Sequence, residues 1–141
     1  MTVLKKFSSH IEYYSIDEAF LDLTDMIIKN INDYITEMKK IIYHYTGIPV
    51  SIGVASTKTL AKVANLLAKK KDNGVENLTI RSSDEINSIL QKIDVRDIWG
   101  VGSQLSKLYK KNNINNGHEL KMKNTAWIRK NTKHHWFENS C

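Results

Sequence analysis

The sequence predicts a protein of the α+β class, in which a small layered part precedes a helical part. Segments typical of strands and of amphipathic helices follow one another in the order ββαβα over the first half of the chain. After Asp94 the pattern changes, because short apolar runs separated by glycines replace the strand-like segments. We therefore expect a layered domain over residues 1–77, a helical domain over residues 78–130, and a disordered or aberrant tail over residues 131–141.

A β-hairpin is expected over residues 10–24, HIEYYSIDEAFLDLT. Aromatic and branched side chains, which favour strands, crowd both sides of a polar break at Asp17 and Glu18. Two adjacent carboxylates therefore lie at the bend of this hairpin.

An amphipathic helix is expected next. Apolar side chains recur at steps of three and four residues from Ile27 to Tyr45, and Gly47 and Pro49 then end the helical pattern. This apolar stripe predicts a helix that covers one face of a sheet.

A short β-rich segment, PVSIGVAS, leads into a second helix, TKTLAKVANLLAKKK, for which Ser56 stands in the N-cap position. The buried stripe of this helix is expected to consist of Leu60, Val63, Ala64 and Leu67. Polar side chains at spacings of four, three and four residues lie on another face, namely Lys58, Lys62, Asn65 and Lys69. One face thus packs into the protein, while the other is able to meet phosphate groups.

The second half of the chain is expected to be mainly helical. Ser82 or Ser83 serves as the N-cap of a helix over DEINSILQKI, and Leu105 lies near the start of a further helix. The region DVRDIWGVGSQLSKLY is expected to form a helix, a glycine hairpin and a helix. A short helix is also expected around Trp127 to Lys130.

Composition and charge restrict the class of protein. The net charge is +6, but residues 1–37 hold three basic and seven acidic side chains, whereas residues 98–137 hold eight basic and one acidic. A basic half suits a polyanionic partner such as nucleic acid, although a solvated lysine-rich surface explains the same composition. The single cysteine, Cys141, excludes a disulfide scaffold, and no run of about 18 apolar residues is present for a membrane span. We expect a soluble, cytoplasmic protein without a membrane partner.

Asp17 and Glu18 are candidate metal ligands. They are flanked by the apolar residues Ile16, Ala19 and Phe20, where a charged group is costly unless an opposite charge offsets it. Magnesium is commonly bound by one or two carboxylates together with water and substrate phosphates. Solvated acids in a surface turn are the alternative explanation.

Lys58 and Lys62 are candidate ligands for a triphosphate. They stand on the first turns of the second helix, whose N-terminus already favours anions through its free N–H groups. A solvated lysine face opposite the apolar stripe is the alternative explanation.

Gly100 and Gly102 are candidate contacts for a DNA backbone. They permit a tight hairpin in which backbone N–H groups approach a phosphate, and Lys107 adds nonspecific attraction. Such contacts hold DNA without reading its sequence. A glycine pair is also common at the C-terminus of a helix, which is the alternative explanation. We expect Trp99 to be a core residue beneath this hairpin rather than a surface on which bases stack.

Three stretches of the sequence, in this order, resemble the Y-family DNA polymerases, and more closely the UmuC branch than the DinB branch. YSIDEAFLDLT is similar to the second catalytic motif of that family, VSIGVASTKTLAKVAN to the strand and helix that follow it, and DVRDIWGVGSQLSKLY to the helix-hairpin-helix of the thumb. The resemblance covers residues 10–130. It implies that residues 1–77 form part of a polymerase palm and that residues 78–130 form a thumb.

The resemblance also implies roles for single residues. Asp17 corresponds to an acid that coordinates both active-site metals, and Glu18 to an acid that coordinates the catalytic metal. Lys62 corresponds to a lysine that contacts the triphosphate of the incoming nucleotide, and Lys58 lies beside it. The implied reaction is the attack of a primer 3′-hydroxyl on a deoxynucleoside triphosphate, with primer–template DNA bound and two Mg²⁺ ions as cofactors. The implied setting is error-prone translesion synthesis in DNA repair and the SOS response, with a UmuD-like accessory protein and a sliding clamp as further partners.

The chain also departs from the family pattern. Residues 1–9 contain no acid, so we expect the first metal-binding aspartate of the family to be absent. We also expect the fingers domain that follows this aspartate in the family, and the little finger at the other end, to be absent. Whether the chain is an enzyme is therefore open, and the alternatives are a non-catalytic DNA-binding module and a remnant of a disrupted polymerase gene. The tail beyond residue 130 no longer resembles the family, and its His134 and His135 are not expected to bind metal.

Overall fold

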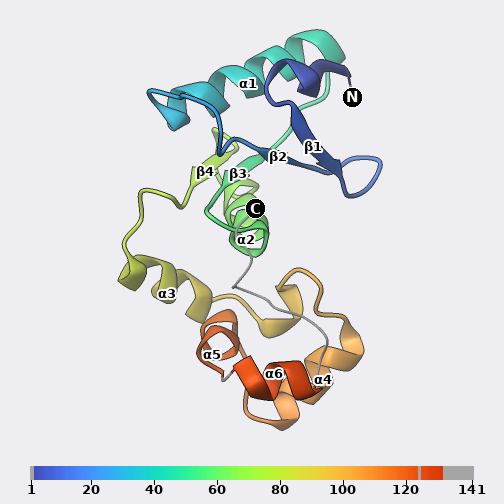
Figure 1. The fold of residues 1–141 in the computed structure, drawn as a ribbon, viewed down its shortest axis with the longest axis vertical. Coiled ribbons are helices and arrows are strands. Elements are labelled where there is room, and N and C mark those ends of the chain that lie inside the picture. Colours follow the sequence, from blue (N-terminus) through green and yellow to red (C-terminus); the bar gives the residue numbers. More distant parts are fainter. Residues whose placement is uncertain (1, 124, 132–141) are drawn as a thin grey trace.

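The computed structural model describes residues 2–123 and 125–131, which form two parts stacked along the long axis of the molecule (Figure 1). The upper part holds four strands between two long helices, and the lower part is helical. This arrangement confirms the expected α+β class and the order of its first five elements. The expected disordered tail, with His134 and His135, lies outside the described residues.

The elements of the described residues are as follows. The helices are η1 (Thr2–Lys6), α1 (Ile31–Thr46), α2 (Lys58–Ala68), α3 (Ser83–Gln91), η2 (Val95–Asp97), α4 (Ser103–Lys111), α5 (Gly117–Met122) and α6 (Thr125–Asn131), of which η1 and η2 are short 3-10 helices. The strands are β1 (His10–Tyr13), β2 (Ala19–Asp22), β3 (Ile52–Val54) and β4 (Val75–Asn77). In this part of the chain no helix has the length and apolar character needed to cross a membrane.

β1 and β2 form the antiparallel hairpin that the sequence predicts. Their register pairs His10 with Asp22 at the open end, so the bend spans residues 14–18 and carries both predicted carboxylates. Ser8 ties the open end together, because its hydroxyl accepts a hydrogen bond from the N–H of His10 at 3.0 Å and donates one to the carbonyl oxygen of Asp22 at 2.7 Å.

α1 begins and ends at its capping residues. The side chain of Asn30 accepts a hydrogen bond from the N–H of Asp33, and Gly47, at a φ of 71°, donates its N–H to the carbonyl oxygen of Tyr43 at 2.8 Å. Gly47 therefore ends the helix as expected. The placement of Ile27 on the apolar stripe is wrong: capping by Asn30 starts the helix after it, and Ile27 is 99% exposed.

α2 begins one residue later than the sequence pattern suggests. Thr57 is the N-cap instead of Ser56, because its backbone is extended and its hydroxyl accepts a hydrogen bond from the N–H of Leu60 at 3.2 Å. The expected buried stripe is confirmed at its centre, where Val63 and Ala64 are at most 1% exposed.

α2 packs directly onto β3 at Gly53. An ideal Cβ atom at this position lies 2.2 Å from the backbone nitrogen of Asn65 and 2.7 Å from the carbonyl oxygen of Ala61. Both distances are far inside van der Waals contact, so only a glycine allows the helix and the strand to approach this closely.

β4 is a strand that the sequence pattern missed. It pairs in parallel with β3, yet two of its three residues, Glu76 and Asn77, are polar, so no alternation of apolar side chains marked it. Both side chains are buried. The carboxylate of Glu76 forms ion pairs with Lys71 and with Arg81, the latter at 3.2 Å. Burial raises the pKa of Glu76, but the hydrogen bonds from Lys71 and Arg81 outweigh it, and the pKa lies below its ordinary value.

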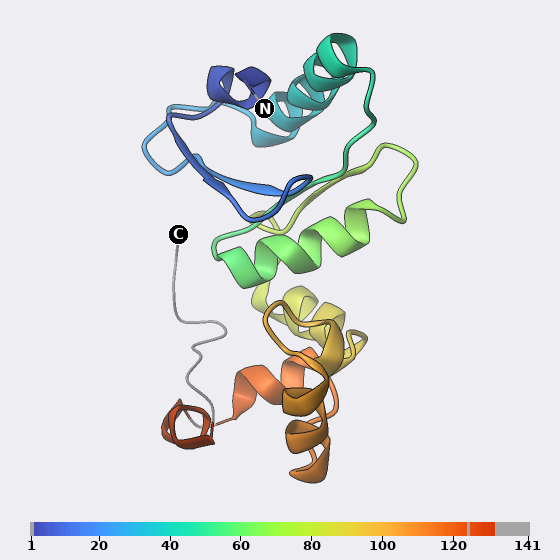
Figure 2. The same cartoon turned by 90° about the vertical axis from the view of Figure 1, so that its right-hand side faces the viewer.

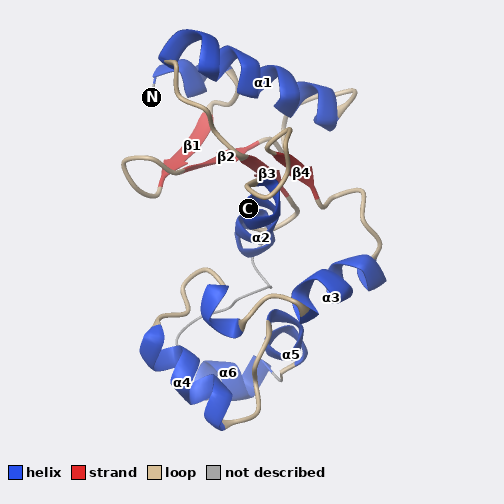
Figure 3. Ribbon diagram, turned by 180° about the vertical axis from the view of Figure 1, so that it is seen from behind, coloured by secondary structure: helices blue, strands red, loops and turns tan. Residues whose placement is uncertain are grey.

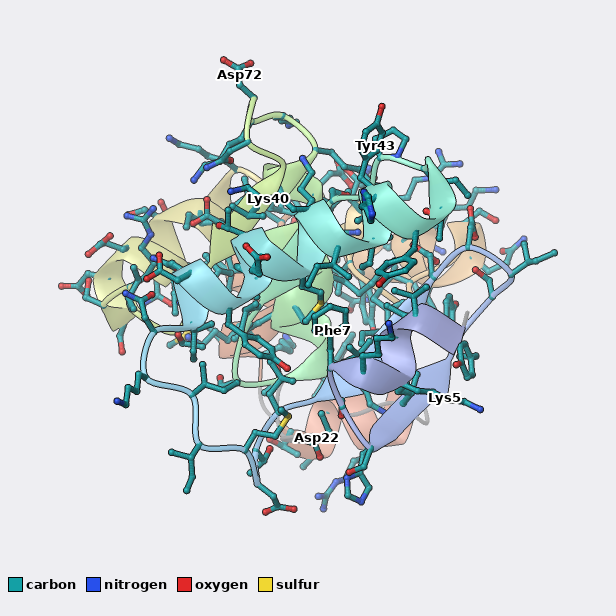
Figure 4. The ribbon with its side chains drawn as sticks, turned by 90° about the horizontal axis from the view of Figure 1, so that it is seen from above. Lys5, Phe7, Asp22, Lys40, Tyr43 and Asp72 are labelled. Atoms are coloured by element: carbon teal, nitrogen blue, oxygen red, sulfur yellow. The ribbon has the colours of Figure 1, made fainter. Side chains whose placement is uncertain are left out.

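The strands lie in a layer between α1 and α2 (Figures 2 and 3). Within the described residues they form two separate sheets, β1–β2 and β3–β4. A small apolar cluster under α1 joins the two sheets. Its buried residues are Phe7, Met38 and Ile42, and they contact Leu21 of β2 and Ile52 of β3. Figure 4 looks down onto α1 and shows Phe7 beside this helix.

A larger apolar core continues from α2 into the lower part of the molecule. Its buried residues are Val63, Ala64, Leu78, Leu90, Val95, Ile98, Val101, Tyr109, Ile114, Leu120 and Ile128. Because α2 contributes to this core, the lower helices share apolar packing with the upper part and are not joined to it by the chain alone.

The helices that the sequence predicts for the lower part are present in the expected order, together with α5, which the sequence pattern missed. Ser82, one of the two serines considered, caps α3 and forms a capping box with Glu85. The chain then makes the short helix η2 and a glycine turn, in which Gly100 has a φ of 87° and Gly102 is the N-cap of α4. The expected short helix around Trp127 is present as α6. The assignment of η2, the glycine turn and α4 to a helix-hairpin-helix stays a prediction.

We expect Gly53→Ala to lower the free energy of unfolding by about 3 kcal/mol, because the new methyl group overlaps backbone atoms of α2. Denaturant unfolding followed by circular dichroism measures the change. Gly102→Ala is the matched control, since no atom lies within 4 Å of an added Cβ and its φ is −85°, and we expect a loss of about 1 kcal/mol or less. Equal losses in the two variants would contradict the close packing of α2 on β3.

The buried Glu76 predicts a pH dependence of stability. Since its pKa in the folded protein lies below the ordinary value of 4.5, its ionisation stabilises the fold above pH 4.5, and this contribution is lost as the pH falls through the folded pKa. We expect the wild type to lose unfolding free energy between about pH 5 and pH 3, and Glu76→Gln to lose less over the same range. Asp72→Asn is the control, because Asp72 projects away from the molecule (Figure 4). An unchanged pH slope in Glu76→Gln would show that other groups set the acid response.

Candidate active site

The bend of the β1–β2 hairpin, residues 14–18, holds both predicted acids, and we term it the acid loop. The N–H groups of Tyr14 and Ser15 donate to the carbonyl oxygen of Glu18, at 3.0 and 3.2 Å, and so close the bend. The hydroxyl of Ser15 donates to the Oδ1 atom of Asp17 at 2.8 Å. Asp17 is exposed, whereas the Glu18 side chain is 34% exposed.

α2 presents its two predicted lysines to this hairpin. The Nζ atom of Lys62 lies 2.6 Å from the Oε1 atom of Glu18, and Lys58 forms a second ion pair with Glu12. The spacing fits because four residues of a helix rise about 6 Å, while two residues of a strand rise about 6.8 Å. Lysines one turn apart on α2 therefore reach two successive cross-strand positions on one face of the hairpin.

Two aromatic rings of the hairpin hold the same lysines. The Nζ atom of Lys58 lies 5.6 Å from the ring centre of Phe20, which is opposite Glu12 in the register. The Nζ atom of Lys62 lies 5.8 Å from the ring centre of Tyr14. Both distances allow a cation–π interaction. Each lysine is thus held by one carboxylate and one ring of the hairpin.

The sequence pattern indicates the lysines and the acids of the loop but not their other partners, which are Glu12, Tyr14 and Phe20. The period of two in a strand is the signal that could have found them, because residues two positions apart lie on one face of the sheet. Of the two predicted acids, Glu18 is the one that the structure brings to a lysine, while Asp17 is hydrogen-bonded within its own loop.

Trp99 contacts this site instead of filling a core. Its ring centre lies 5.6 Å from that of Tyr14 and 5.3 Å from that of Phe20. The indole is half-buried and belongs to neither apolar cluster. The expectation of a core residue is therefore wrong, because the glycine turn after η2 directs this side chain toward the hairpin of the upper part.

Asp17 and Glu18 suit a divalent cation as a partial set of ligands. Carboxylate oxygens are the donors that Mg²⁺ prefers, and one or two suffice where water and phosphate oxygens complete its shell. Across residues 2–123 and 125–131, no group of three or more histidine, cysteine or acidic side chains is arranged to hold a metal ion. The donor set fits a hard cation whose remaining ligands are water or phosphate oxygens. In this structure the Oε1 atom of Glu18 is paired with Lys62.

The predicted DNA-contacting residues lie around the start of α4. Gly100 and Gly102 are exposed, and no side chain caps the first turn of α4, so backbone N–H groups remain for a ligand there. Lys107 is exposed on the same helix. Lys110 is paired with Asp94 at 3.3 Å, so its charge is partly balanced within the protein.

Comparison with curated proteins gives a consistent group of relatives. The profile of the impB/mucB/samB family matches residues 1–66. Protein UmuC of Salmonella typhimurium strain LT2 is 38% identical over 134 residues, which are 92% of this chain and 31% of UmuC. DNA polymerase IV of Saccharolobus solfataricus is 31% identical over 117 residues, which are 82% of this chain and 32% of that protein. The chain thus spans about a third of the length of these relatives.

Solved structures of similar fold belong to the same group. An insertion ternary complex of Dbh DNA polymerase superimposes with a TM-score of 0.70 and 31% sequence identity, over 94% of this chain and 38% of that chain. DinB from Sulfolobus solfataricus superimposes with a TM-score of 0.66 and 32% identity, over 92% of this chain and 38% of that chain. Both parts of the present fold therefore have counterparts in these polymerases.

We expect the pair Lys62–Glu18 to couple more strongly than the pair Lys58–Glu12, because its side chains are less exposed. A double-mutant cycle on unfolding free energy, with alanine at each position, measures both couplings. The expected coupling is about 1 kcal/mol for Lys62–Glu18 and about 0.3 kcal/mol for Lys58–Glu12, and both should shrink at about 0.5 M salt. A Lys62–Glu18 coupling near zero would mean that solvent screens this pair.

Proposed function

Since the chain belongs to the Y-family DNA polymerases, the family of UmuC and DNA polymerase IV, and spans about a third of the length of its curated relatives, we propose that it supplies part of a nucleotidyl-transfer site. The observation that carries this proposal is the contact between the acid loop and α2. There a carboxylate of the metal-binding type, Glu18, and a base of the phosphate-binding type, Lys62, lie 2.6 Å apart. In this proposal residues 1–77 act as a partial palm and residues 78–130 as a thumb.

The lysines of α2 bind the triphosphate of the incoming deoxynucleotide. Lys62 and Lys58 are the first cations on this face of the helix, and each is held by a carboxylate and a ring that a phosphate group can replace. An ammonium group gains charge-assisted hydrogen bonds to phosphate oxygens, which compensates for the lost ion pair. Nucleotide binding at Lys62 therefore frees the carboxylate of Glu18.

Asp17 and the freed Glu18 hold a divalent cation, expected to be Mg²⁺, with two such ions in the intact family. When bound, such ions neutralise charge that develops on the reacting phosphate oxygens. Asp17 is ready for this role, because it is exposed and held in place by the hydroxyl of Ser15.

The glycine turn and α4 hold primer–template DNA by its backbone. The uncapped N–H groups of the first turn of α4, which follow Gly102, bind a phosphate oxygen, Gly100 shapes the turn before them, and Lys107 adds charge attraction. These contacts grip DNA of any sequence, as a polymerase requires. The finer setting of the proposal is error-prone translesion synthesis on damaged DNA in the SOS response of the cytoplasm, with a UmuD-like protein and a sliding clamp as partners of the whole polymerase.

A second candidate function is that of a non-catalytic DNA-binding module. The observation that favours it is the pairing of Glu18 with Lys62, because this pairing balances the charge of Glu18 without a metal ion. In this case the glycine turn and the basic helices bind duplex DNA while the acid loop stays closed.

Primer extension by the chain with Mg²⁺ and all four deoxynucleotides separates the two functions. If the site is catalytic, we expect incorporation that Asp17→Asn lowers by at least about a hundredfold, because a lost metal ligand removes several kcal/mol of charge stabilisation. Asp25→Asn, which changes another exposed acid beyond β2, should leave the rate unchanged. Salt-sensitive DNA binding without incorporation would support the second function, and the absence of DNA binding would contradict both.

A further inference from the structure

Trp99 is the side chain through which the glycine turn before α4 contacts the acid-bearing hairpin. Its indole packs against Tyr14 with an interplanar angle of 74° and against Phe20 with an angle of 58°. Tyr14 and Phe20 also contact each other, at 6.3 Å between ring centres and an angle of 69°. The three rings therefore form a closed aromatic triangle, of which two corners belong to the hairpin and one to the lower part of the molecule.

Both hairpin corners of this triangle also bear a lysine of the site. The Nζ atom of Lys58 lies 5.6 Å from the ring centre of Phe20, and the Nζ atom of Lys62 lies 5.8 Å from the ring centre of Tyr14. Tyr14 is the first residue of the acid loop, and its N–H donates to the carbonyl oxygen of Glu18 at the other end of the loop. A shift of Tyr14 therefore also moves this loop. The position of the indole therefore affects the positions of both lysines and of the acid loop.

The hairpin needs such a support because it has little packing of its own at this end. Tyr14 is 50% exposed and Ile16 is 95% exposed. The loop is closed by two backbone hydrogen bonds to a single carbonyl oxygen, that of Glu18. Aromatic pairs at these separations and angles are favourable beyond the area that they bury.

The backbone next to Trp99 is the turn that the proposed function assigns to DNA. Gly100 follows it directly and has a φ of 87°, and Gly102 begins α4 two residues later. Val101 and Ile98 are buried in the lower core, so the turn is anchored on both sides of Trp99 and Gly100. A displacement of this turn by a bound phosphate is passed to the indole through one peptide unit.

We propose that Trp99 is a positioning residue that couples the DNA-contacting turn at Gly100 and Gly102 to the acid loop at Asp17 and Glu18. The indole acts through its contacts with Tyr14 and Phe20. The coupling rests on the proposed function, whereas the support of the acid loop by the indole holds for the free protein as well.

Hydrogen–deuterium exchange of the whole chain tests the support in the free protein. The amides of Tyr14 and Ser15 are the reporters, because both donate to Glu18 within the loop. In Trp99→Leu we expect these two amides to exchange about tenfold faster than in the wild type, since the ring contacts that oppose local opening are lost. In Trp99→Phe, which keeps an aromatic ring, exchange should stay within about twofold of the wild type.

Trp127→Leu is the matched control for a general loss of stability. Trp127 is also half-buried, but it packs against Tyr109 of the lower core at 6.2 Å. We expect this variant to leave the exchange of Tyr14 and Ser15 unchanged. Equal acceleration in both leucine variants, or none in Trp99→Leu, would overturn the positioning role.

The same measurement with a short primer–template duplex tests the coupling. In the wild type and in Trp99→Phe we expect DNA to slow the exchange of Tyr14 and Ser15 at least about threefold, and in Trp99→Leu we expect DNA to bind without this effect. Equal protection in Trp99→Leu would overturn the coupling. If no variant binds the duplex, the proposed function and the coupling both fail, while exchange in the free chain still decides whether Trp99 supports the acid loop.

Discussion

The contact between α2 and β3 is the constraint on which the rest of this structure depends. The helix lies against the strand because residue 53 has no side chain, and any larger residue places an atom inside the backbone of α2. From this position α2 turns one face to the lower apolar core and its lysines to the hairpin. A small displacement of the helix therefore changes the stability of the core and the geometry of the ion pairs together.

The two parts of the molecule are connected more closely than their chain positions suggest. The larger core runs from Val63 of α2 to Ile128 of α6, and so crosses the boundary expected near residue 77. The aromatic triangle adds a second connection, from the turn before α4 to the acid loop. The acids, the bases and the glycine turn before α4 are thus placed relative to one another by apolar and aromatic packing, and ion pairs then join the acids to the bases.

Much of this arrangement could be predicted from the sequence, because many of its elements follow from local patterns of apolar residues and from capping residues. The hairpin, α1 and α2 follow from apolar periodicity, and Gly47 and Ser82 end or begin helices by their own chemistry. β4 could not be predicted, since the burial of Glu76 depends on Lys71 and Arg81 meeting it in space. The contacts of Trp99 with Tyr14 and Phe20 could not be predicted for a similar reason. Sequence periodicity does not show that a turn of the lower part faces the hairpin of the upper part. The choice between Ser56 and Thr57 as N-cap is beyond sequence reasoning, because both hydroxyl residues satisfy the same preference.

The two apolar clusters differ greatly in size, and this has a consequence for how the protein opens. Among the described residues the cluster under α1 has three buried members, whereas the core that includes α2 has eleven. Cooperative units with fewer buried contacts open at lower free energy than the rest of a fold. We therefore expect the hairpin and α1 to open first, and this unit carries the acids, while the lysines lie on the unit expected to be more stable. The candidate site lies between these two units, so partial unfolding is expected to separate the acids from the lysines before α2, which holds both lysines, unfolds.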